Sequence, residues 1–155
     1  MKTHNYNLSV KWTGNNGEGT NGYRSYKRSY EIFVEGKEII NGSADAAFLG
    51  DVTKYNPEEL LLASLSSCHM LWYLHLCAET GVTVYSYTDL PIGTMIETEN
   101  GGGRFESVKL FPTVIILRKD MVEAATLLHK KANELCFIAN SVNFTVTHEP
   151  VIKIK

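Results

Sequence analysis

The stretch Asn56–Cys77, NPEELLLASLSSCHMLWYLHLC, decides the fold because it predicts one long central helix. Asn56 is a residue type that caps helices, Pro57 suits a first helical turn, and Glu58 follows where the helix dipole favours an acid. No Asp, Glu, Lys or Arg occurs from residue 60 to residue 78, and Gly81 is placed to end the helix. We therefore predict a helix buried nearly all round, at the centre of a domain or between two subunits.

The same segment approaches the length of a membrane span, which needs about 20 apolar residues. It also carries polar side chains that are costly in lipid, namely Ser64, Ser66, Ser67, His69 and His75. The N-terminal stretch MKTHNYNLSVKW lacks the apolar core of a secretory signal. We therefore expect a core helix without a membrane partner, in a cytoplasmic protein.

The composition is that of one globular domain covering residues 1–155. Apolar residues make up 44% of the chain and charged residues 21%, and the formal net charge is −2. This balance gives no sign of a nucleic-acid or acidic-lipid partner. Three cysteines are an odd number and too few for a disulfide scaffold, which favours a reducing compartment.

Patterns of alternating apolar residues and of β-branched residues predict strands before and after the central helix in the sequence. The predicted strands are residues 6–13, 29–35, 82–99, 104–117 and 144–155, with a hairpin turn at 36–37 and a loop at 41–54. A second helix, about 121–136, carries apolar residues at helical spacing, and we expect Asp120 to cap it. This order predicts an α+β fold with largely antiparallel sheet.

A glycine-rich segment and a basic cluster precede the second predicted strand. Residues 17–22 match G-x-G-x-x-G, but no apolar helix follows, so we interpret them as a turn rather than a dinucleotide site. Arg24, Lys27 and Arg28 lie among tyrosines in the next stretch. Without further information, this cluster is typical of a solvated edge strand.

Helix geometry separates two of the three cysteines. Cys77 comes nine residues after Cys68, which places it on the opposite face of one helix. Cys136 lies at the end of the second predicted helix. Thiols on separate helices can meet and form a reversible disulfide, whereas a buried cysteine often acts only as a small hydrophobic residue. The residues alone leave both interpretations open.

Two other chemistries fit the spacing poorly. His69 lies about 100° around the helix from Cys68, and His75 lies about 10 Å along it, so neither suits a cysteine–histidine protease pair. A metal site would lack the close ligand pairs typical of zinc. Its candidate ligands would be Cys68, His75 and Cys136, with His129 or His148. We expect no metal and no cofactor.

Several motifs together resemble the OsmC/Ohr family of thiol peroxidases, over nearly the whole chain. They are the helix start at residues 56–61, the Ser67-Cys68 pair, the lone Cys136, and the runs CHMLWYLHL at 68–76 and CFIANSVNF at 136–144. The resemblance implies an OsmC/Ohr-like fold with antiparallel-rich sheets around a long buried central helix. It also implies an intertwined homodimer with two active sites at the subunit interface.

The resemblance assigns the candidate catalytic residues. Cys68 matches the peroxidatic cysteine, Cys136 the resolving cysteine, and Glu58 the buried glutamate ten residues before the reactive cysteine. A loop arginine completes the family's site, and we choose Arg24 for it, with Arg28 as the fallback. The resemblance gives Cys77, the third cysteine, no role.

The implied activity is that of a two-cysteine thiol peroxidase in oxidative stress defence. It would reduce organic hydroperoxides, alkyl or lipid, to alcohols through a cysteine sulfenic acid and an intramolecular disulfide. An external dithiol, for which a lipoyl-type compound is a candidate, would reset the pair. The alternatives are a non-catalytic protein of the same fold that binds an apolar ligand, and a hydrolase such as a thioesterase.

Two positions depart from the family pattern, and helix geometry adds a constraint. Phe137 stands where the organic-hydroperoxide branch usually has proline, and Leu49 stands where we expect arginine in the most similar branch. Ten helical residues span about 15 Å, so Glu58 cannot reach Cys68 on one straight helix. Either the helix breaks near residues 64–67, or a second subunit supplies the acid and its arginine.

Overall fold

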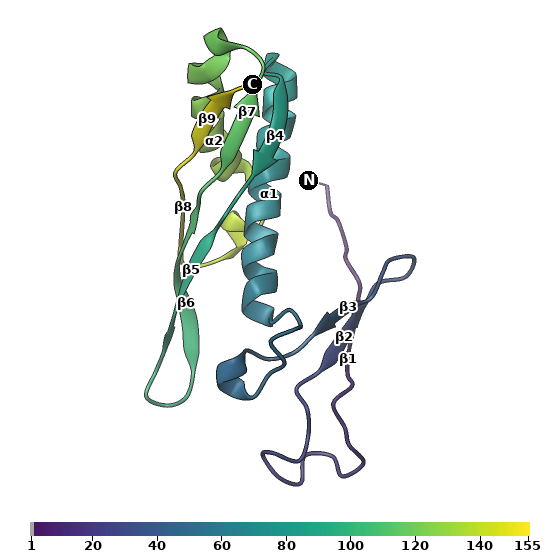
Figure 1. Cartoon of the computed structure of the whole chain (residues 1–155). Helices are drawn as coiled ribbons and strands as arrows, with labels where there is room; N and C mark the ends of the chain where they lie inside the picture. The colour runs from purple at the N-terminus through teal and green to yellow at the C-terminus, as the bar shows by residue number, and fades with distance from the viewer. Residues whose placement is uncertain (1) are drawn as a thin grey trace. The chain divides into compact units, whose positions relative to one another are not determined.

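The computed structural model describes residues 2–155. They form two compact units, which meet in sequence between Leu60 and Leu61. Each unit contains its own sheet structure, and Figure 1 labels the elements of both. The expectation of a single domain over residues 1–155 stays a prediction.

The N-terminal unit holds one antiparallel sheet of three strands. β1 (Ser9–Trp12), β2 (Tyr30–Phe33) and β3 (Ile40–Gly42) pair in that order, and the 3-10 helix η1 (Ala46–Phe48) follows. The first two strands lie within the predicted ranges and are shorter. The predicted turn at 36–37 is confirmed, because Gly36 has φ 77° and the chain returns there as β3. β3 was missed in the sequence analysis, which placed a loop from residue 41.

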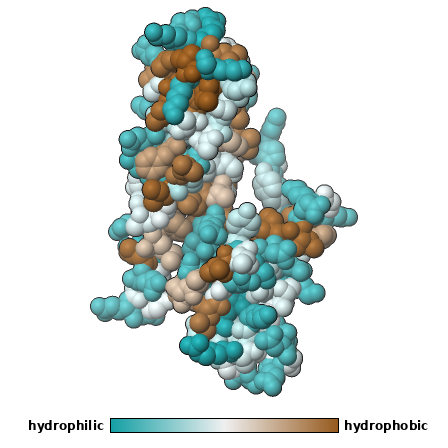
Figure 2. Space-filling model, viewed as in Figure 1, coloured by the Kyte–Doolittle hydropathy of each residue, from teal (hydrophilic) through white to brown (hydrophobic). Residues whose placement is uncertain are grey.

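One face of this sheet is apolar and uncovered within its unit. The register pairs Val10 with Ile32 and Ile32 with Ile40, so the three side chains share that face. Val10 is 62% exposed and Ile40 is 41% exposed. Figure 2 shows hydrophobic side chains at the surface of this unit. An apolar sheet face of this kind needs another layer to cover it.

The helix α1 (Pro57–Thr80) begins at the predicted residue because a reciprocal cap holds its first turn. Asn56 Oδ1 accepts the backbone N–H of Glu59 at 2.7 Å, and Glu59 Oε2 accepts the backbone N–H of Asn56 at 3.1 Å. Together these bonds satisfy two backbone donors that no helical carbonyl could reach.

The other end of α1 also follows the prediction. Gly81 adopts φ 76°, and the backbone N–H of Val82 bonds back to the carbonyl of Cys77 at 2.9 Å. The helix is unbroken between its ends. The suggested break near residues 64–67, which would have let Glu58 approach Cys68 within one chain, is therefore wrong.

Only one side of α1 is buried within the described chain. The buried side chains recur every fourth residue, and the opposite side is exposed at Ala63, Ser67, Leu71 and His75; the buried ones are Leu65, His69, Tyr73 and Cys77. By length and composition alone, α1 could cross a membrane. The core helix of a globular protein meets the same test, and a histidine buried against other protein segments favours that interpretation.

The C-terminal unit contains two sheets of three strands, ordered β4-β7-β9 and β5-β6-β8. The strands are β4 (Val84–Thr88), β5 (Ile92–Glu97), β6 (Gly103–Leu110), β7 (Thr113–Ile116), β8 (Thr145–His148) and β9 (Val151–Ile154). The β4–β7 and β5–β6 pairs are antiparallel, whereas the β7–β9 and β6–β8 pairs are parallel. Antiparallel pairing therefore predominates over the whole chain, as predicted.

Three prolines explain why each predicted long strand is two shorter ones. Pro91 lies between β4 and β5, Pro112 between β6 and β7, and Pro150 between β8 and β9. Proline offers no backbone N–H to a neighbouring strand, so the ladder is interrupted at each of them. The expectation of continuous strands over 82–99, 104–117 and 144–155 was wrong at these positions.

The helix α2 (Val122–Leu135) lies between the 3-10 helices η2 (Lys119–Met121) and η3 (Ala139–Ser141). Asp120 does not cap α2, contrary to the prediction, because it lies inside η2 and its carboxylate pairs with Arg118. α2 buries Ala125 and Ala132 in a cluster with Tyr73 of α1. In Figure 1, the C-terminal part of α1 lies together with α2 and the β4-β7-β9 sheet at one end of the C-terminal unit.

Candidate functional site

The structure brings together the two cysteines that the family resemblance assigns to one site. Cys68 lies in the middle of α1 and is partly exposed, and Cys136 follows the last residue of α2 and is buried. The two side chains are neighbours, and both are free thiols. Burial, followed by the hydrogen bond to Cys68, raises the pKa of the Cys136 thiol. Cys136 is therefore protonated at neutral pH.

The backbone turns at Cys136 and directs polar groups at its sulfur. Cys136 leaves the helical conformation with φ −65° and ψ 112°. The backbone N–H of Ala139, at the start of η3, donates to Cys136 Sγ over 3.4 Å. This tight turn fixes the sulfur on the side of the chain that faces α1.

Two aromatic residues that lie near the cysteines in the chain contact each other. Trp72, one turn after Cys68 on α1, meets the ring of Phe137 edge-on with centroids 5.7 Å apart. Leu71, Trp72 and His75 line a mostly apolar pocket of about 260 Å³. A small apolar molecule that enters this pocket would therefore approach the Cys68 side of α1.

Buried histidines occupy the neighbouring side of α1. His69 is 1% exposed and His129 of α2 is fully buried, and His69 Nε2 lies 3.0 Å from His129 Nδ1. His148 at the end of β8 lies against His69, with ring centroids 5.4 Å apart. Burial is the main cause that lowers the pKa of all three imidazoles, which are consequently neutral at neutral pH.

These histidines do not form a metal site. Among the described residues, no three His, Cys, Asp or Glu side chains are placed to hold a metal ion together. The third cysteine, Cys77, is buried in a different cluster with Tyr73 and Val82. Cys77 therefore lies apart from the Cys68–Cys136 pair, as its helical position predicts.

In the N-terminal unit, Glu58 presents a carboxylate oxygen without a partner. Glu58 Oε2 and Tyr30 Oη are both shielded from solvent and have no hydrogen-bond partner among residues 2–155. Burial, followed by the charge of Glu58, raises the pKa of the Tyr30 hydroxyl. An unpaired buried carboxylate oxygen is costly, so this position calls for a donor such as a guanidinium.

The two candidate arginines differ in what they already bind. Arg28 donates to the carbonyls of Tyr26 at 2.8 Å and Tyr23 at 2.6 Å. Its guanidinium also lies over the rings of both tyrosines, 4.2 and 4.6 Å from their centroids. Arg24 is exposed, and within residues 2–155 it has no ion pair or side-chain hydrogen bond. Arg28 therefore holds its own loop together, and Arg24 is the arginine free to serve another group.

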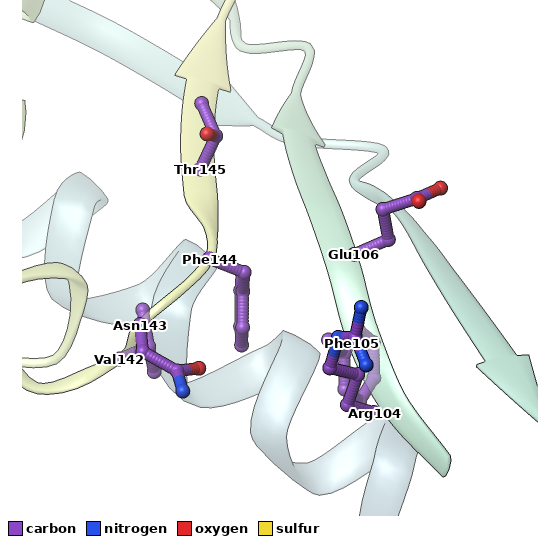
Figure 3. Close-up of a pocket in the computed structure, with 7 residues that line it drawn as sticks. All are labelled: Arg104, Phe105, Glu106, Val142, Asn143, Phe144 and Thr145. Carbon is purple, nitrogen blue, oxygen red and sulfur yellow. The ribbon is translucent and has the colours of Figure 1, made fainter. Parts of the chain in front are cut away.

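A larger, more polar pocket lies where β6 and the segment before β8 diverge (Figure 3). Its volume is about 530 Å³. Parallel pairing of β6 with β8 begins only at Ser107 and Thr145, and before that point the two segments separate. Phe105 and Phe144 stack across the gap with centroids 5.5 Å apart, whereas Glu106 points to the other side of β6. No cysteine or histidine lines this pocket.

Sequence reasoning missed the polar contacts around the site. The histidine pair joins residues 60 positions apart, and no local pattern indicates that contact. The proximity of Tyr30 to Glu58 could not be predicted from sequence either, because it depends on how the first sheet packs against the start of α1. The one available hint was the unusual presence of a histidine directly after Cys68 in an apolar helix.

Comparisons with known proteins agree with this geometry. Residues 50–150 match a family model described as OsmC-like protein. The structure is similar to that of an OsmC-like protein of unknown function from Vibrio cholerae, with a TM-score of 0.86 and 30% sequence identity over 96% of this chain and 100% of the other. A search of curated proteins found no match.

Two more distant structures share the fold. One is an organic hydroperoxide resistance protein from Elizabethkingia anophelis, with a TM-score of 0.67 and 19% identity over the whole of both chains. The other is an organic hydroperoxide resistance protein from Legionella pneumophila, with a TM-score of 0.67 and 18% identity over 97% of this chain and 99% of that one. At these identities the likeness shows the fold alone.

Proposed function

This chain belongs to the family of OsmC-like proteins, and on that premise we propose that it is a two-cysteine thiol peroxidase acting on organic hydroperoxides in the cytoplasm. The family includes proteins described as organic hydroperoxide resistance proteins, which supports a role in peroxide stress. The observation that carries the proposal is the contact between the thiols of Cys68 and Cys136 on two different elements.

The first chemical step takes place at Cys68. Its thiolate attacks one oxygen of the hydroperoxide, so that a sulfur–oxygen bond forms and the oxygen–oxygen bond breaks. The alkoxide leaves and takes up a proton, which gives the alcohol and a sulfenic acid on Cys68. The raised pKa of Cys136 supports this order, because Cys136 remains protonated during the first step.

The second step uses the neighbouring thiol. Cys136 sulfur attacks the sulfenic sulfur of Cys68, a sulfur–sulfur bond forms, and the sulfur–oxygen bond breaks. The hydroxide that leaves combines with the Cys136 proton to give water. An external dithiol then reduces the disulfide by exchange, which restores both thiols and oxidises the dithiol. These reaction steps require no metal, flavin or haem.

Glu58 and Arg24 would favour the thiolate form of Cys68. Arginine keeps its charge under all ordinary conditions, so its guanidinium can stabilise a thiolate in an apolar pocket. The buried, unpartnered oxygen of Glu58 is suited to hold such a guanidinium in place. Leu49, which stands where related proteins are expected to have arginine, adopts φ 63° and contributes no charge there.

A homodimer accounts for two features of the single chain. α1 is continuous, so Glu58 lies about 15 Å along the helix from Cys68, and the acid and arginine beside each thiol pair would come from the second copy. The exposed side of α1 and the apolar sheet face around Ile32 would also be covered there. Size measurement by light scattering tests this, since a monomer at micromolar concentration would contradict it.

A count of free thiols tests the activity directly. The reduced protein has three thiols, and one equivalent of cumene hydroperoxide should leave one, Cys77. Cys77→Ser should lose its two remaining thiols at the wild-type rate, and Cys68→Ser should lose none. A wild-type protein that keeps all three thiols and binds a fatty acid tightly would instead be a carrier of apolar ligands.

The resolving role of Cys136 has its own test. Cys136→Ser should consume one equivalent of hydroperoxide and stop, leaving a sulfenic acid on Cys68 that dimedone traps. Sustained turnover of this variant with a dithiol such as dihydrolipoamide would show that Cys136 is not required. Acyl-thioester hydrolysis that survives Cys68→Ser would point to a hydrolase.

A further inference from the structure

The hydrogen bond between His69 and His129 joins the two helices that bring the cysteines together. His69 follows Cys68 directly on α1, and His129 lies seven residues, or about 10 Å of helix, before Cys136. Their nitrogens Nε2 and Nδ1 are 3.0 Å apart, in the interior of the C-terminal unit. Among residues 2–155 this is the only hydrogen bond between a side chain of α1 and a side chain of α2.

α2 therefore touches α1 at two points on neighbouring sides of α1. Its middle meets the His69 side, where the rings of Tyr73 and His129 stack at 3.8 Å. Its C-terminal end meets the Cys68 side through Cys136. Two contacts separated along one rigid helix fix both its rotation and its position along α1.

We propose that His69 and His129 are positioning residues for the second step of the reaction: their hydrogen bond holds α2 where the Cys136 sulfur reaches Cys68. A disulfide forms only when the two Cα atoms are within about 7 Å and the side chains point toward one another. A shift of about 1 Å in a reacting group is enough to slow a step strongly. This inference rests on the proposed function only in calling disulfide formation the second step of the reaction. The placement of the two thiols by the histidines does not depend on that function.

The buried imidazoles are suited to a positional role rather than to acid–base exchange with the thiols. Both are neutral, because burial lowers their pKa values to about 4 for His69 and about 3 for His129. The far nitrogens, His69 Nδ1 and His129 Nε2, have no hydrogen-bond partner in the part of the chain that the structure describes. The imidazole pair thus directs its one hydrogen bond across the two helices and makes none with either cysteine.

Substitutions that keep the ring and remove the hydrogen bond test the proposal. His129→Phe preserves the stack on Tyr73 but cannot bond to His69, whereas His129→Asn places an amide near the position of Nδ1. His148→Phe is the matched control, because His148 is in the same cluster and has no hydrogen bond to either histidine. Each reduced variant is mixed with one equivalent of cumene hydroperoxide, and sulfenic acid and disulfide are followed by quenching and mass measurement.

In His129→Phe we expect consumption of the hydroperoxide at the wild-type rate, with disulfide formation slower by roughly ten- to a hundredfold. Sulfenic acid should then accumulate, and excess hydroperoxide should convert Cys68 to sulfinic acid. His129→Asn should recover most of the rate, and His148→Phe should behave as the wild type. An unchanged second step in His129→Phe, or equal slowing in His148→Phe, would overturn the proposal. Should His129→Phe fail to fold, His69→Phe makes the same comparison from α1.

Oxidation by diamide separates this inference from the proposed function. Diamide oxidises neighbouring thiols without a hydroperoxide, so the rate of the Cys68–Cys136 disulfide then reports only where the sulfurs lie. If wild-type protein ignores hydroperoxides but forms this disulfide with diamide faster than His129→Phe does, the proposed function fails and the positioning role stands. Equal diamide rates in the two proteins would refute the positioning role alone.

Discussion

The ring of Tyr73 lies flat against the ring of His129, with centroids 3.8 Å apart and 15° between the planes. This stack, together with His69 and Tyr87, closes the interior of the C-terminal unit around an imidazole. A charge on His129 would have to form there without water, which is why burial lowers its pKa to about 3.

We predict from this burial that the protein loses stability in mild acid. The unfolded chain binds protons at its histidines near pH 6.5, whereas the folded chain binds them near pH 4 at His69 and pH 3 at His129. The stabilisation is therefore complete above pH 6.5 and is lost as the pH falls toward the folded pKa values. The unfolding free energy should fall by up to about 1.4 kcal/mol per pH unit for each histidine. Urea titrations at a series of pH values would measure this slope.

The slope should be measured at a pH where the titration of carboxylates contributes little to it. Asp51, Asp120 and Glu149 also have lowered pKa values in the folded chain, but their ordinary pKa values are already as low as 3.8, 3.8 and 4.5. Their stabilisation is present above those values and is lost only below them. Between about pH 6.5 and pH 5, His129→Phe should therefore show a shallower slope than the wild type. The same slope in both proteins would contradict the prediction.

Asp89 connects three segments at the break between β4 and β5. One carboxylate oxygen accepts the Ser66 hydroxyl at 2.5 Å, and the other accepts the backbone N–H of Phe111 at 2.7 Å. Asp89→Ala would leave both donors unpaired in a partly buried place, at an expected cost of about 2–4 kcal/mol in unfolding free energy. Chemical denaturation would measure this, and Ser66→Ala should cost less because the bond to Phe111 remains. One neutral hydrogen bond contributes roughly 1 kcal/mol to stability. If Asp89→Ala lowers the unfolding free energy by less than about 1 kcal/mol, this role is refuted.

The ends of α1 could be predicted from sequence because their causes are local. Asn56 and Gly81 each act within a few residues, on backbone groups that belong to the same turn. The strand breaks had an equally local signal in Pro91, Pro112 and Pro150, which the sequence analysis did not use. The prediction that Asp120 caps the second helix was wrong because a carboxylate before a helix can either cap the helix or bind a neighbouring side chain. Here the Asp120 carboxylate binds Arg118.

The contacts that build the site were beyond local reasoning. Cys68 and Cys136 could be named as a possible pair, but their meeting depends on how α2 crosses α1. The bond between His69 and His129 depends on the same crossing. Periodicity shows which side of each helix is buried, but not which residue of another helix lies against it.

Different contacts around Arg24 and Arg28 predict different defects when each is removed. Arg24→Ala should slow the reaction of Cys68 with cumene hydroperoxide, because the thiolate loses a cation, and should leave the unfolding free energy unchanged. Arg28→Ala removes two hydrogen bonds and two aromatic contacts, and should cost about 1–2 kcal/mol of stability.

The pH dependence of Cys68 alkylation by iodoacetamide separates the two arginines. In Arg24→Ala the alkylation curve should move to higher pH than in the wild type, since thiolate forms less readily. Arg24→Lys should move it less, because a positive charge remains. A curve that moves in Arg28→Ala but not in Arg24→Ala would transfer the electrostatic role to Arg28.

If the protein acts as proposed, Trp72 should make it selective for organic hydroperoxides. Its indole ring, with Leu71 and His75, lines the apolar pocket on the Cys68 side of α1. A cumyl group can bury apolar surface against that ring, whereas hydrogen peroxide has no apolar surface to bury. Trp72→Ala should therefore lower kcat/KM for cumene hydroperoxide by roughly tenfold to a hundredfold, a loss of about 1.4–2.7 kcal/mol of transition-state stabilisation.

The comparison of two oxidants decides between substrate binding and thiol positioning at this residue. Trp72 also meets Phe137 edge-on, next to Cys136, so its loss could displace the second cysteine instead. A binding role predicts that kcat/KM for hydrogen peroxide stays within about twofold of the wild type, and that Trp72→Phe keeps most of the preference for cumene hydroperoxide. An equal fall for both oxidants would show that the ring does not select the substrate, because only the apolar hydroperoxide can gain from contact with it.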